Sequence, residues 1–237
     1  MTEAQPKFIE RIVCLANSRK PLGRCVAGKR MDANSKVGTW IRPISAQQSH
    51  AISEDDRRYP DGHTAQFLDI IEIPCVEPRP TLHQTENVLI DDRFYWELKG
   101  RPTWKQLQAM VDTPGPLWAN GFSAYYNQNN RVPEGLLDSQ GGSLKLIPLD
   151  RIVLHAGPKA PDFGNMKLIV RASFDFAGQH YKLDLTDPEL EKECLNKGNG
   201  DYELISVLAC ISLAELHTDG YAYKVVASII TEQRASS

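Results

Sequence analysis

The feature that most constrains this chain is a series of short apolar runs separated by clusters of Gly, Pro and Asn. Many of the runs alternate apolar with polar residues or are rich in β-branched side chains, which is typical of strands. They are RIVCLA, RCVAGKRM, TWIRPIS, LDIIEIPCV, SLKLIPLDRIVLHA, MKLIVRASFDF, HYKLDLT, LACISLAEL and YKVVASII. The long alternation of helices and strands that a parallel α/β sheet requires is missing. We therefore expect a mainly β protein.

Two segments carry clear helical signals. In TWKQLQAMV, Thr103 is placed to cap the helix, and in DPELEKECL Asp187 is the cap with Pro188 at the first helical position. A β-rich chain with one helix in each half and long irregular connections favours small barrels over a two-layer sandwich. Five-stranded, partly open barrels use roughly 70 to 120 residues each. The 237 residues of this chain accommodate two of them.

The stretch 111–143 is rich in Pro, Gly and Asn and has little periodicity. Its aromatic residues favour an ordered loop that packs on the body of the protein. They are Trp118, Phe122, Tyr125 and Tyr126. We expect a domain boundary near Gly157, where a Gly-Pro pair interrupts the apolar pattern. This gives an N-terminal barrel with a long loop insertion over residues 1–157 and a C-terminal barrel, packed against it, over residues 158–237.

The composition is that of a globular protein without export or membrane signals. No apolar run approaches the roughly 18 residues that mark a membrane helix, and MTEAQPKFIERI lacks the apolar region of a signal peptide. We therefore expect a cytoplasmic protein that does not enter a membrane. The five cysteines form no C-x-x-C pair and lie in apolar runs, which favours buried, reduced thiols. They are Cys14, Cys25, Cys75, Cys194 and Cys210.

Charge is distributed unevenly along the chain. Residues 1–60 contain 11 Lys and Arg against 6 Asp and Glu, whereas residues 61–150 contain 7 against 12 and residues 151–237 contain 9 against 12. The net charge of −3 argues against bulk binding to nucleic acid. A surface for an anionic ligand is therefore expected on the N-terminal segment.

The segment IVCLANSRKPLGRCVAG places two adjacent cations, Arg19 and Lys20, between two apolar strands. Pro21 and Gly23 are typical turn residues, so the cations are expected at a turn that connects the strands. Neighbouring strands can add basic side chains and an aromatic ring to the same face, a combination suited to phosphate contact and base stacking. The predicted anion-binding residues are Asn17, Ser18, Arg19, Lys20, Arg24, Lys29, Trp40 and Arg42.

Trp40 and Arg42 stand two residues apart in GTWIRPIS and therefore point to the same side of their strand. On a barrel face, this pair could stack a base and hold a phosphate. The alternative is structural, with Trp40 in the core and Arg42 in an ion pair with Asp69 or Glu72. The sequence leaves both interpretations open.

The segment HQTENVLID follows an apolar strand and begins with a cluster of polar residues. His83 and Glu86 could act as a base and the group that orients it, provided that both face a pocket. The competing interpretation is that they are turn and hydrogen-bonding residues at a strand end. Nucleophilic catalysis by Cys14 or Cys25 is less favoured, because burial in an apolar strand raises the pKa of a thiol.

Metal and nucleotide-hydrolysing sites find little support. His50, Asp61 and His63 in SHAISEDDRRYPDGH are suitable ligands for a divalent ion, but their spacing matches no metal motif and a charged surface turn explains them equally well. No metal or cofactor is expected. There is no Gly-rich phosphate loop, which disfavours an NTPase, and no G-x-S-x-G, H-E-x-x-H or kinase signature.

Six segments, taken in order, resemble the bacterial dual OB-containing domain family. They are IVCLANSRKPLGRCVAG, GTWIRPIS, FLDIIEIP, HQTENVLID, YKLDLTDP and the pair SLAEL and GYAYKVVASII. The resemblance runs from about Ile12 to Ile230 and implies two tandem OB-like barrels. By analogy with the OB-fold, it also implies nucleic-acid or nucleotide binding. The expected fold is thus mainly β with minor α: two tandem OB-like barrels with short helices and long ordered loops.

Three functions remain open. In the first, a binding module presents the basic and aromatic face of the N-terminal barrel to single-stranded DNA, RNA or a nucleotide. In the second, an enzyme acts on a nucleotide or nucleic-acid base with His83 and Glu86 as the acid–base pair. In the third, an adaptor docks a protein partner through its acidic C-terminal barrel. The tyrosines considered for that contact are Tyr181, Tyr202, Tyr221 and Tyr223. We favour the binding module over the enzyme.

Overall fold

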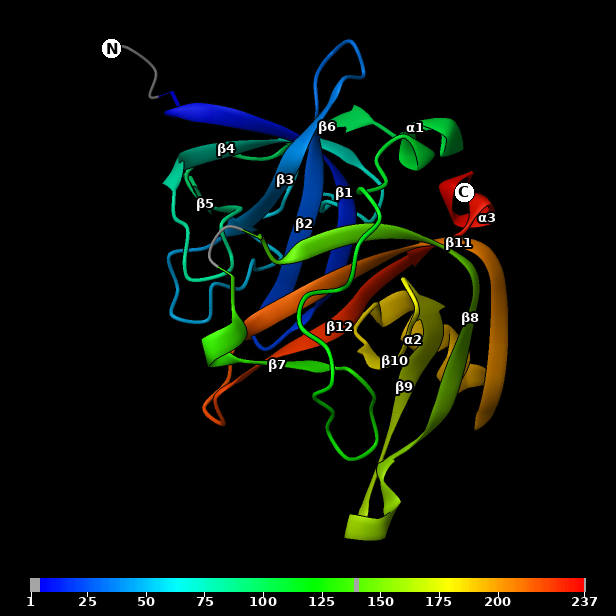
Figure 1. Ribbon diagram of the computed structural model, residues 1–237. Coiled ribbons are helices and arrows are strands. Elements are labelled where there is room, and N and C mark those ends of the chain that lie inside the picture. The colour runs from blue at the N-terminus through cyan, green and yellow to red at the C-terminus, as the bar shows by residue number, and fades with distance from the viewer. Residues whose placement is uncertain (1–4, 139–140, 237) are drawn as a thin grey trace. The chain divides into compact units, whose positions relative to one another are not determined.

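The computed structural model of the chain describes residues 5–138 and 141–236, and strands dominate it (Figure 1). Strands make up 52% and helices 11% of the structure, which confirms the mainly β prediction. The chain divides into two compact units. The first contains residues 5–110 with 141–142, and the second contains residues 111–138 and 143–235.

The first unit is a closed barrel of five strands with one added strand and a short helix. Its elements are β1 (Phe8–Lys20), β2 (Gly23–Met31), β3 (Val37–Ile44), β4 (Ile70–Pro78), β5 (Asn87–Ile90), β6 (Glu97–Gly100) and α1 (Trp104–Gln108). β1, β2 and β3 pair antiparallel in sequence order, and β4 pairs antiparallel with both β1 and β5. The parallel pairing of β3 with β5 closes the ring, and β6 extends β4 at the edge.

The second unit repeats this arrangement with longer strands. Its elements are β7 (Arg131–Pro133), η1 (Glu134–Leu136), β8 (Leu144–Ala160), η2 (Pro161–Phe163), β9 (Asn165–Phe176), β10 (Gln179–Leu185), α2 (Pro188–Lys197), β11 (Gly200–Leu216), β12 (Tyr221–Ile230) and α3 (Glu232–Ala235). β8, β9 and β10 pair antiparallel in order, and β11 pairs antiparallel with both β8 and β12. The parallel pairing of β10 with β12 closes the ring, and β7 adds to β12.

The two barrels therefore share one strand order. Counted within each barrel, the strands run first, second, third, fifth and fourth around the ring, and the third and fifth are parallel. This is the five-stranded Greek-key barrel of the OB type, so the two OB-like barrels expected from the sequence are confirmed. α2 connects the third and fourth strands of the second barrel, whereas the corresponding described residues 45–69 of the first barrel form turns and short bridges.

Each barrel encloses its own apolar core because alternate strand residues face inward. Ile12 and Ile73 are fully buried in the first core, and Leu154 and Ile211 are almost or fully buried in the second. The expected helix caps are present as well. Thr103 forms a capping box with Gln106 at α1, and the Asp187 side chain accepts a hydrogen bond from the Leu190 amide at α2.

The structure divides the chain at a different place from the boundary expected near Gly157. Gly157 lies inside β8, where it pairs with Ile169 of β9, and the first unit ends at Met110 instead. The register of this pairing shifts between Pro158 and Ala160. A proline without an amide proton is tolerated at such a bulge, so the Gly-Pro pair marks an irregularity within a strand rather than a linker.

Residues 111–138 of the long connection before β8 pack on the second barrel, as its aromatic residues suggested. Leu117 is fully buried in the core, and Trp118 packs against it. The Leu117 amide donates a hydrogen bond of 3.4 Å to the hydroxyl of Tyr181. Tyr125, further along the same connection, is 75% exposed.

Candidate functional site

The cations Arg19 and Lys20 lie at the end of β1, at a two-residue turn, as the sequence predicts. Arg19 is exposed and is the register partner of Arg24 across the hairpin. The turn residue Leu22 has a φ of +68° and is 82% exposed. Gly23 is needed where β2 begins, because a Cβ atom there would lie 2.4 Å from the carbonyl oxygen of Ile52.

Three of the other predicted anion-binding residues make contacts within the first barrel. The side-chain amide of Asn17 donates to the carbonyl of Ala65, and the Ser18 hydroxyl donates to the carbonyl of Cys25, each at 3.4 Å. Arg24 lies 3.9 Å from a carboxylate oxygen of Glu54. These side chains support the hairpin and its neighbouring loop, and Arg19 is the member of the predicted set with an exposed side chain.

Lys29 is buried and does not form part of an accessible basic face. Only 6% of it is exposed, and its ammonium donates a hydrogen bond of 2.7 Å to the carbonyl of Met110. The same ammonium lies 5.3 Å from the centre of the Trp40 ring, because Lys29 and Trp40 are register partners. Lys29 is therefore a cationic neighbour of Trp40 inside the first barrel.

Arg42 forms a buried ion pair, which supports the structural alternative for this residue. Its guanidinium lies 3.3 Å from Glu86, and each of the two side chains is 5% exposed. The partner is neither Asp69 nor Glu72, as considered from the sequence. Parallel pairing of β3 with β5 brings the Arg42 amide to the Glu86 carbonyl at 2.9 Å, and this places the two side chains together.

His83 and Glu86 lie in a closely packed polar turn between β4 and β5. His83 is 1% exposed, and Gln84 exchanges two backbone hydrogen bonds with Thr81. The side-chain amide of Asn87 also donates to the side-chain oxygen of Gln84. Acid–base catalysis needs a substrate within hydrogen-bond reach, and these side chains line neither of the pockets described below. Their contacts favour the structural interpretation.

The possible metal ligands are not gathered into a site. His63 and Asp61 form an exposed pair with 3.3 Å between Nδ1 and a carboxylate oxygen. Throughout residues 5–138 and 141–236, no group of three or more His, Cys, Asp or Glu side chains is placed to hold a metal ion. The segment is a charged surface turn in the described structure.

The thiols of Cys14 and Cys75 in the first barrel are expected to be unreactive in the folded protein. Burial raises the pKa of both Cys14 and Cys75 to about 12. We predict that iodoacetamide at about pH 8 leaves both unmodified while the half-buried Cys25 reacts first, because the thiolate is the attacking species. Peptide mass spectrometry after timed alkylation measures this, with urea-unfolded protein as the control. Equal rates at Cys14 and Cys25 in the folded protein would contradict the prediction.

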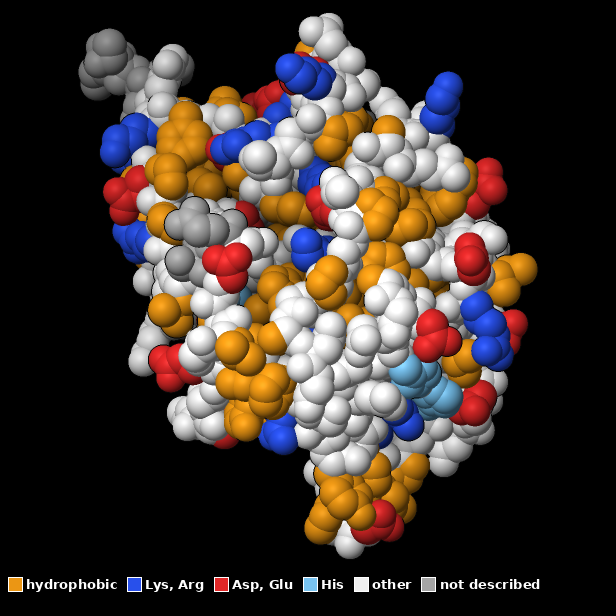
Figure 2. All heavy atoms as spheres, in the orientation of Figure 1, with side chains coloured by type: hydrophobic (Ala, Val, Ile, Leu, Met, Phe, Trp, Pro, Cys, Tyr) orange, Lys and Arg blue, Asp and Glu red, His pale blue; other side chains and the backbone are white. Residues whose placement is uncertain are grey.

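Three aromatic rings meet beside the tip of the β8–β9 hairpin. The ring of Tyr125 lies edge-to-face with those of Tyr126 and Phe163, at centre distances of 4.9 and 5.2 Å. Phe163 is 69% exposed, and Figure 2 shows hydrophobic side chains gathered on the projecting tip of this hairpin. Large exposed rings that cluster in this way mark a contact surface rather than a core.

Arg171 on β9 is held in place beside these rings. Its guanidinium lies 5.3 Å from the centre of the Tyr126 ring, and its Nε donates a 2.7 Å hydrogen bond to Asn127. A second nitrogen donates to the carbonyl of Lys159 at 2.6 Å, and Asp184 lies 3.4 Å from Nε. A guanidinium fixed in this way beside exposed rings can stack on a planar ligand or hold an anionic one.

The rings and Arg171 line a pocket of about 410 Å³, which we call the ring site. Phe163 lies in the connection between the first and second strands of the barrel, and His217 in that between the fourth and fifth. Arg171 and Asp184 come from the second and third strands. OB-folds bind oligonucleotides on the second and third strands and these two connections. The ring site therefore lies where this fold commonly carries a ligand.

A family model for the dual OB-containing domain matches residues 10–229, most of the chain. The chain belongs to this family. No curated protein matches it. In the part of the chain that the structure describes, no helix has the length and apolar character needed to span a membrane.

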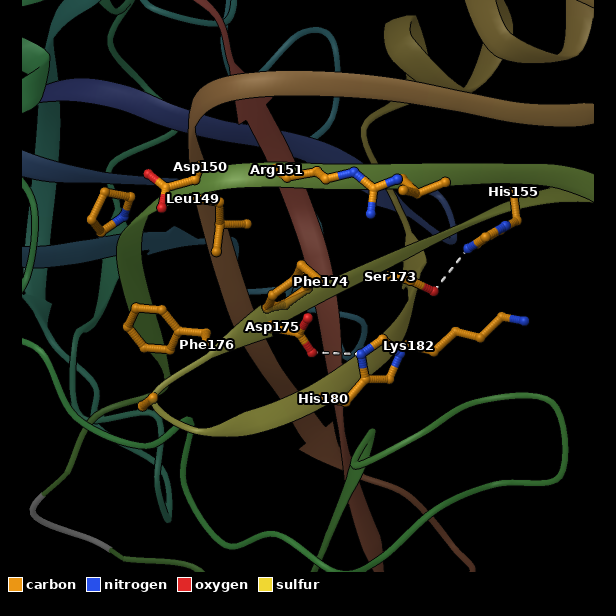
Figure 3. Close-up of a pocket in the computed structure, with 13 residues that line it drawn as sticks. Leu149, Asp150, Arg151, His155, Ser173, Phe174, Asp175, Phe176, His180 and Lys182 are labelled. Carbon is orange, nitrogen blue, oxygen red and sulfur yellow. Dashed lines mark hydrogen bonds and ion pairs between the residues drawn. The ribbon is translucent and has the colours of Figure 1, made fainter.

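A second pocket of this dual OB domain, of about 770 Å³, lies on β8, β9 and β10 (Figure 3). We call it the strand-face pocket. Leu149 and Phe176 lie toward one end of it, and His155, Ser173 and Lys182 lie toward the other. At this end, His155 Nε2 lies 2.8 Å from Ser173 Oγ.

The two pockets open on the same side of the second barrel's strands. Ser173 of the strand-face pocket and Arg171 of the ring site are two residues apart on β9, and Lys182 and Asp184 are two apart on β10. Residues two apart on a strand point to the same face. The outward face of β9 and β10 is therefore one surface that carries both pockets.

The tyrosines considered for protein docking do not form one accessible surface of the dual OB domain. Tyr181 is fully buried and stacks on Phe174 at a centre distance of 5.3 Å, which corrects its placement at the surface. The others are half-buried, and each makes a contact within the second barrel. Tyr202 donates to the Gly198 carbonyl, Tyr221 lies under the Arg131 guanidinium, and Tyr223 donates to Asp219.

The ring site was not predicted from the sequence, because its members are far apart in the chain. Charge counting pointed to the N-terminal quarter as the anion-binding surface, and the acidic C-terminal barrel was considered only for docking a protein partner. A usable signal was present in PDFGN, where an aromatic residue stands in a tight turn between two long strands. Gly164 has a φ of +71°, and Phe163 beside it is held outward at the turn.

Proposed function

We propose that this dual OB domain binds single-stranded nucleic acid, or a nucleotide, at the ring site of its second barrel. The observation that carries the proposal is the meeting of Tyr125, Phe163 and Arg171 at the strands and connections that OB-folds use for such ligands. Bases stack on exposed aromatic side chains with little dependence on sequence, because every base has a flat π-face. Broad base tolerance is therefore expected.

Charge around the ring site suggests that stacking contributes more than phosphate contact. Arg171 and Lys159 are near Asp184 and Asp162, and the last 87 residues carry 9 basic against 12 acidic side chains. In a plot of the logarithm of the binding constant against the logarithm of the salt concentration, each phosphate contact to a single strand makes the slope more negative by about 0.7. With Arg171 and Lys159 as the basic side chains of the site, we expect a slope of about −1 to −2.

The β1–β2 turn of the first barrel is a second candidate contact. Arg19 is exposed there, and the turn occupies the same topological place as the connection that bears Phe163. If this turn carries the ligand instead, the salt dependence is expected to fall on removal of its cations, because they act through phosphate. The two surfaces therefore predict different responses to the same titration.

Fluorescence anisotropy with labelled DNA and RNA strands of about 12 nucleotides, a length within reach of one OB-fold, tests the proposal. Phe163→Ala and Tyr125→Ala are each expected to weaken binding by about 1–3 kcal/mol, or roughly 5- to 150-fold. The matched control is Tyr95→Ala, since Tyr95 is an exposed tyrosine of the first barrel at 58% exposure. It should bind as the unmodified protein does.

The double variant Arg19→Ala/Lys20→Ala separates the two surfaces. Unchanged affinity in this variant, together with loss in Phe163→Ala, supports the ring site. Loss confined to Arg19→Ala/Lys20→Ala assigns binding to the first barrel. No binding of DNA, RNA or a labelled nucleotide at low salt would overturn the proposal as a whole.

A further inference from the structure

Three side chains on neighbouring strands of the second barrel form a hydrogen-bonded series. Asp201 on β11 lies 2.7 Å from Nδ1 of His155 on β8, and Nε2 of His155 lies 2.8 Å from Oγ of Ser173 on β9. We propose that Ser173 is a nucleophile that hydrolyses small carboxylic esters, with His155 as its general base. This activity goes beyond nucleic-acid binding and does not depend on it.

The strand register holds the three groups together. Asp201 and His155 are direct register partners between β11 and β8. Ser173 is the partner of Val153 between β8 and β9, so it stands diagonally next to His155. Direct and diagonal neighbours on one face of a sheet are within side-chain reach. The series is therefore built on rigid strands rather than on loops.

The order of the contacts suits activation of a hydroxyl. A carboxylate that accepts a hydrogen bond from Nδ1 fixes the tautomer in which Nε2 has a free electron pair. Nε2 can then accept the proton of the Ser173 hydroxyl as the oxygen attacks. Asp201 acts through His155 and is a positioning residue, whereas His155 and Ser173 both line the strand-face pocket.

The pocket offers room for a substrate beside Ser173. It measures about 770 Å³, and the apolar side chains of Leu149 and Phe176 lie toward its far end (Figure 3). Lys182 is the register partner of Ser173 on β10 and lines the same pocket. We assign its ammonium the role of stabilising negative charge on the carbonyl oxygen of the substrate. An ester with a short acyl group and an apolar alcohol fits these surroundings.

The chemistry balances without a further reactant other than water. Ser173 Oγ bonds to the carbonyl carbon while its proton passes to His155 Nε2, and the carbonyl oxygen becomes an oxyanion beside Lys182. Collapse of this intermediate breaks the bond to the alcohol, which takes the proton from His155. Water then attacks the acyl-serine, again through His155, and releases the carboxylic acid and free Ser173.

The test uses p-nitrophenyl acetate turnover and labelling by a fluorophosphonate probe, both on the full chain. We expect one covalent adduct, mapped to Ser173 by peptide mass spectrometry. Ser173→Ala and His155→Gln should lower turnover by about 100-fold or more, to the rate of buffer with protein surface alone. Ser206→Ala removes an exposed serine hydroxyl of β11 and should leave both readouts unchanged.

Asp201→Asn distinguishes positioning from a structural role. Loss of tautomer control should lower kcat with KM unchanged. The circular dichroism spectrum and the oligonucleotide binding of Ser173→Ala should match those of the unmodified protein. Failure of the esterase proposal is therefore separable from failure of the proposed binding function. Absence of an adduct on Ser173, or turnover that survives Ser173→Ala, would overturn the esterase proposal.

Discussion

Glu86→Gln is expected to lower the free energy of unfolding of the first barrel by about 3–5 kcal/mol. The change keeps the shape of the side chain but removes its charge, so the buried guanidinium of Arg42 loses the carboxylate that lies 3.3 Å from it. Because each side chain of the pair is only 5% exposed, water cannot reach the guanidinium to replace the lost carboxylate. Urea denaturation followed by tryptophan fluorescence measures the change.

A variant that removes both charges separates this effect from simple loss of packing. Arg42→Met/Glu86→Leu removes both charges and is expected to be more stable than Glu86→Gln, because no uncompensated charge is left in the interior. The matched control is Glu77→Gln, which breaks a surface pair with Arg79 and should have no measurable effect. A destabilisation by Glu86→Gln no larger than that of the control would contradict the prediction.

Lys224→Met is expected to destabilise the second barrel by about 2–3 kcal/mol and to weaken the oligonucleotide binding that we propose for the ring site. The lysine is 1% exposed, and its nitrogen donates to the carbonyl of Ala119 at 2.6 Å and to the side chain of Asn120 at 2.8 Å. Methionine leaves both acceptors without this donor. The connection that they belong to carries Tyr125, so its rings should lose order together with stability.

The pH dependence of stability offers a second readout for Lys224. Burial lowers the pKa of this amine to about 7 from its usual 10.5. Between about pH 7 and 8.5, the unfolded chain therefore holds a proton that the folded barrel has released. The free energy of unfolding should rise with pH in this window, by at most about 1.4 kcal/mol per unit. Above this pH window, the cysteine thiols of the unfolded chain ionise, and their ionisation lowers the free energy of unfolding as the pH rises.

Urea denaturation at several pH values in this window measures the slope. Lys224→Met should remove most of it, whereas Lys192→Met, at an exposed lysine of α2, should leave it in place. A slope that is unchanged in Lys224→Met would show that other groups cause the pH dependence. A flat profile in the unmodified protein would show that Lys224 stays protonated in the folded barrel.

Local sequence signals predicted the elements well. Alternating and β-branched runs indicated strands, Thr103 and Asp187 indicated helix starts, and the Arg19–Lys20 pair was correctly expected at a turn. These features depend on residues close together in the chain. The Gly-Pro pair at Gly157 misled the domain division, since a bulge inside a strand and a linker use the same residue types.

The candidate site was predicted far less well. Lys29, Trp40 and Arg42 were correctly placed on neighbouring strands, but their exposure depended on what packs over them. The Met110 carbonyl lies about 80 residues from Lys29 in sequence, and the position of Glu86 beside Arg42 required the parallel β3–β5 pairing. Neither contact leaves a local signal, because each joins residues that lie far apart in the sequence.

By itself, the sequence determined a β-rich chain, the residues at its turns and caps, and the burial of four of its five thiols, whereas the OB type of its barrels came from the family resemblance. The features that the sequence determined follow from the hydrophobic period and from backbone preferences that act over a few residues. Tertiary structure alone decided which cations became structural, and it brought Tyr125, Phe163 and Arg171 into one site and Asp201, His155 and Ser173 into one series. The physical reason is strand register, which places residues from distant segments side by side once the barrel closes.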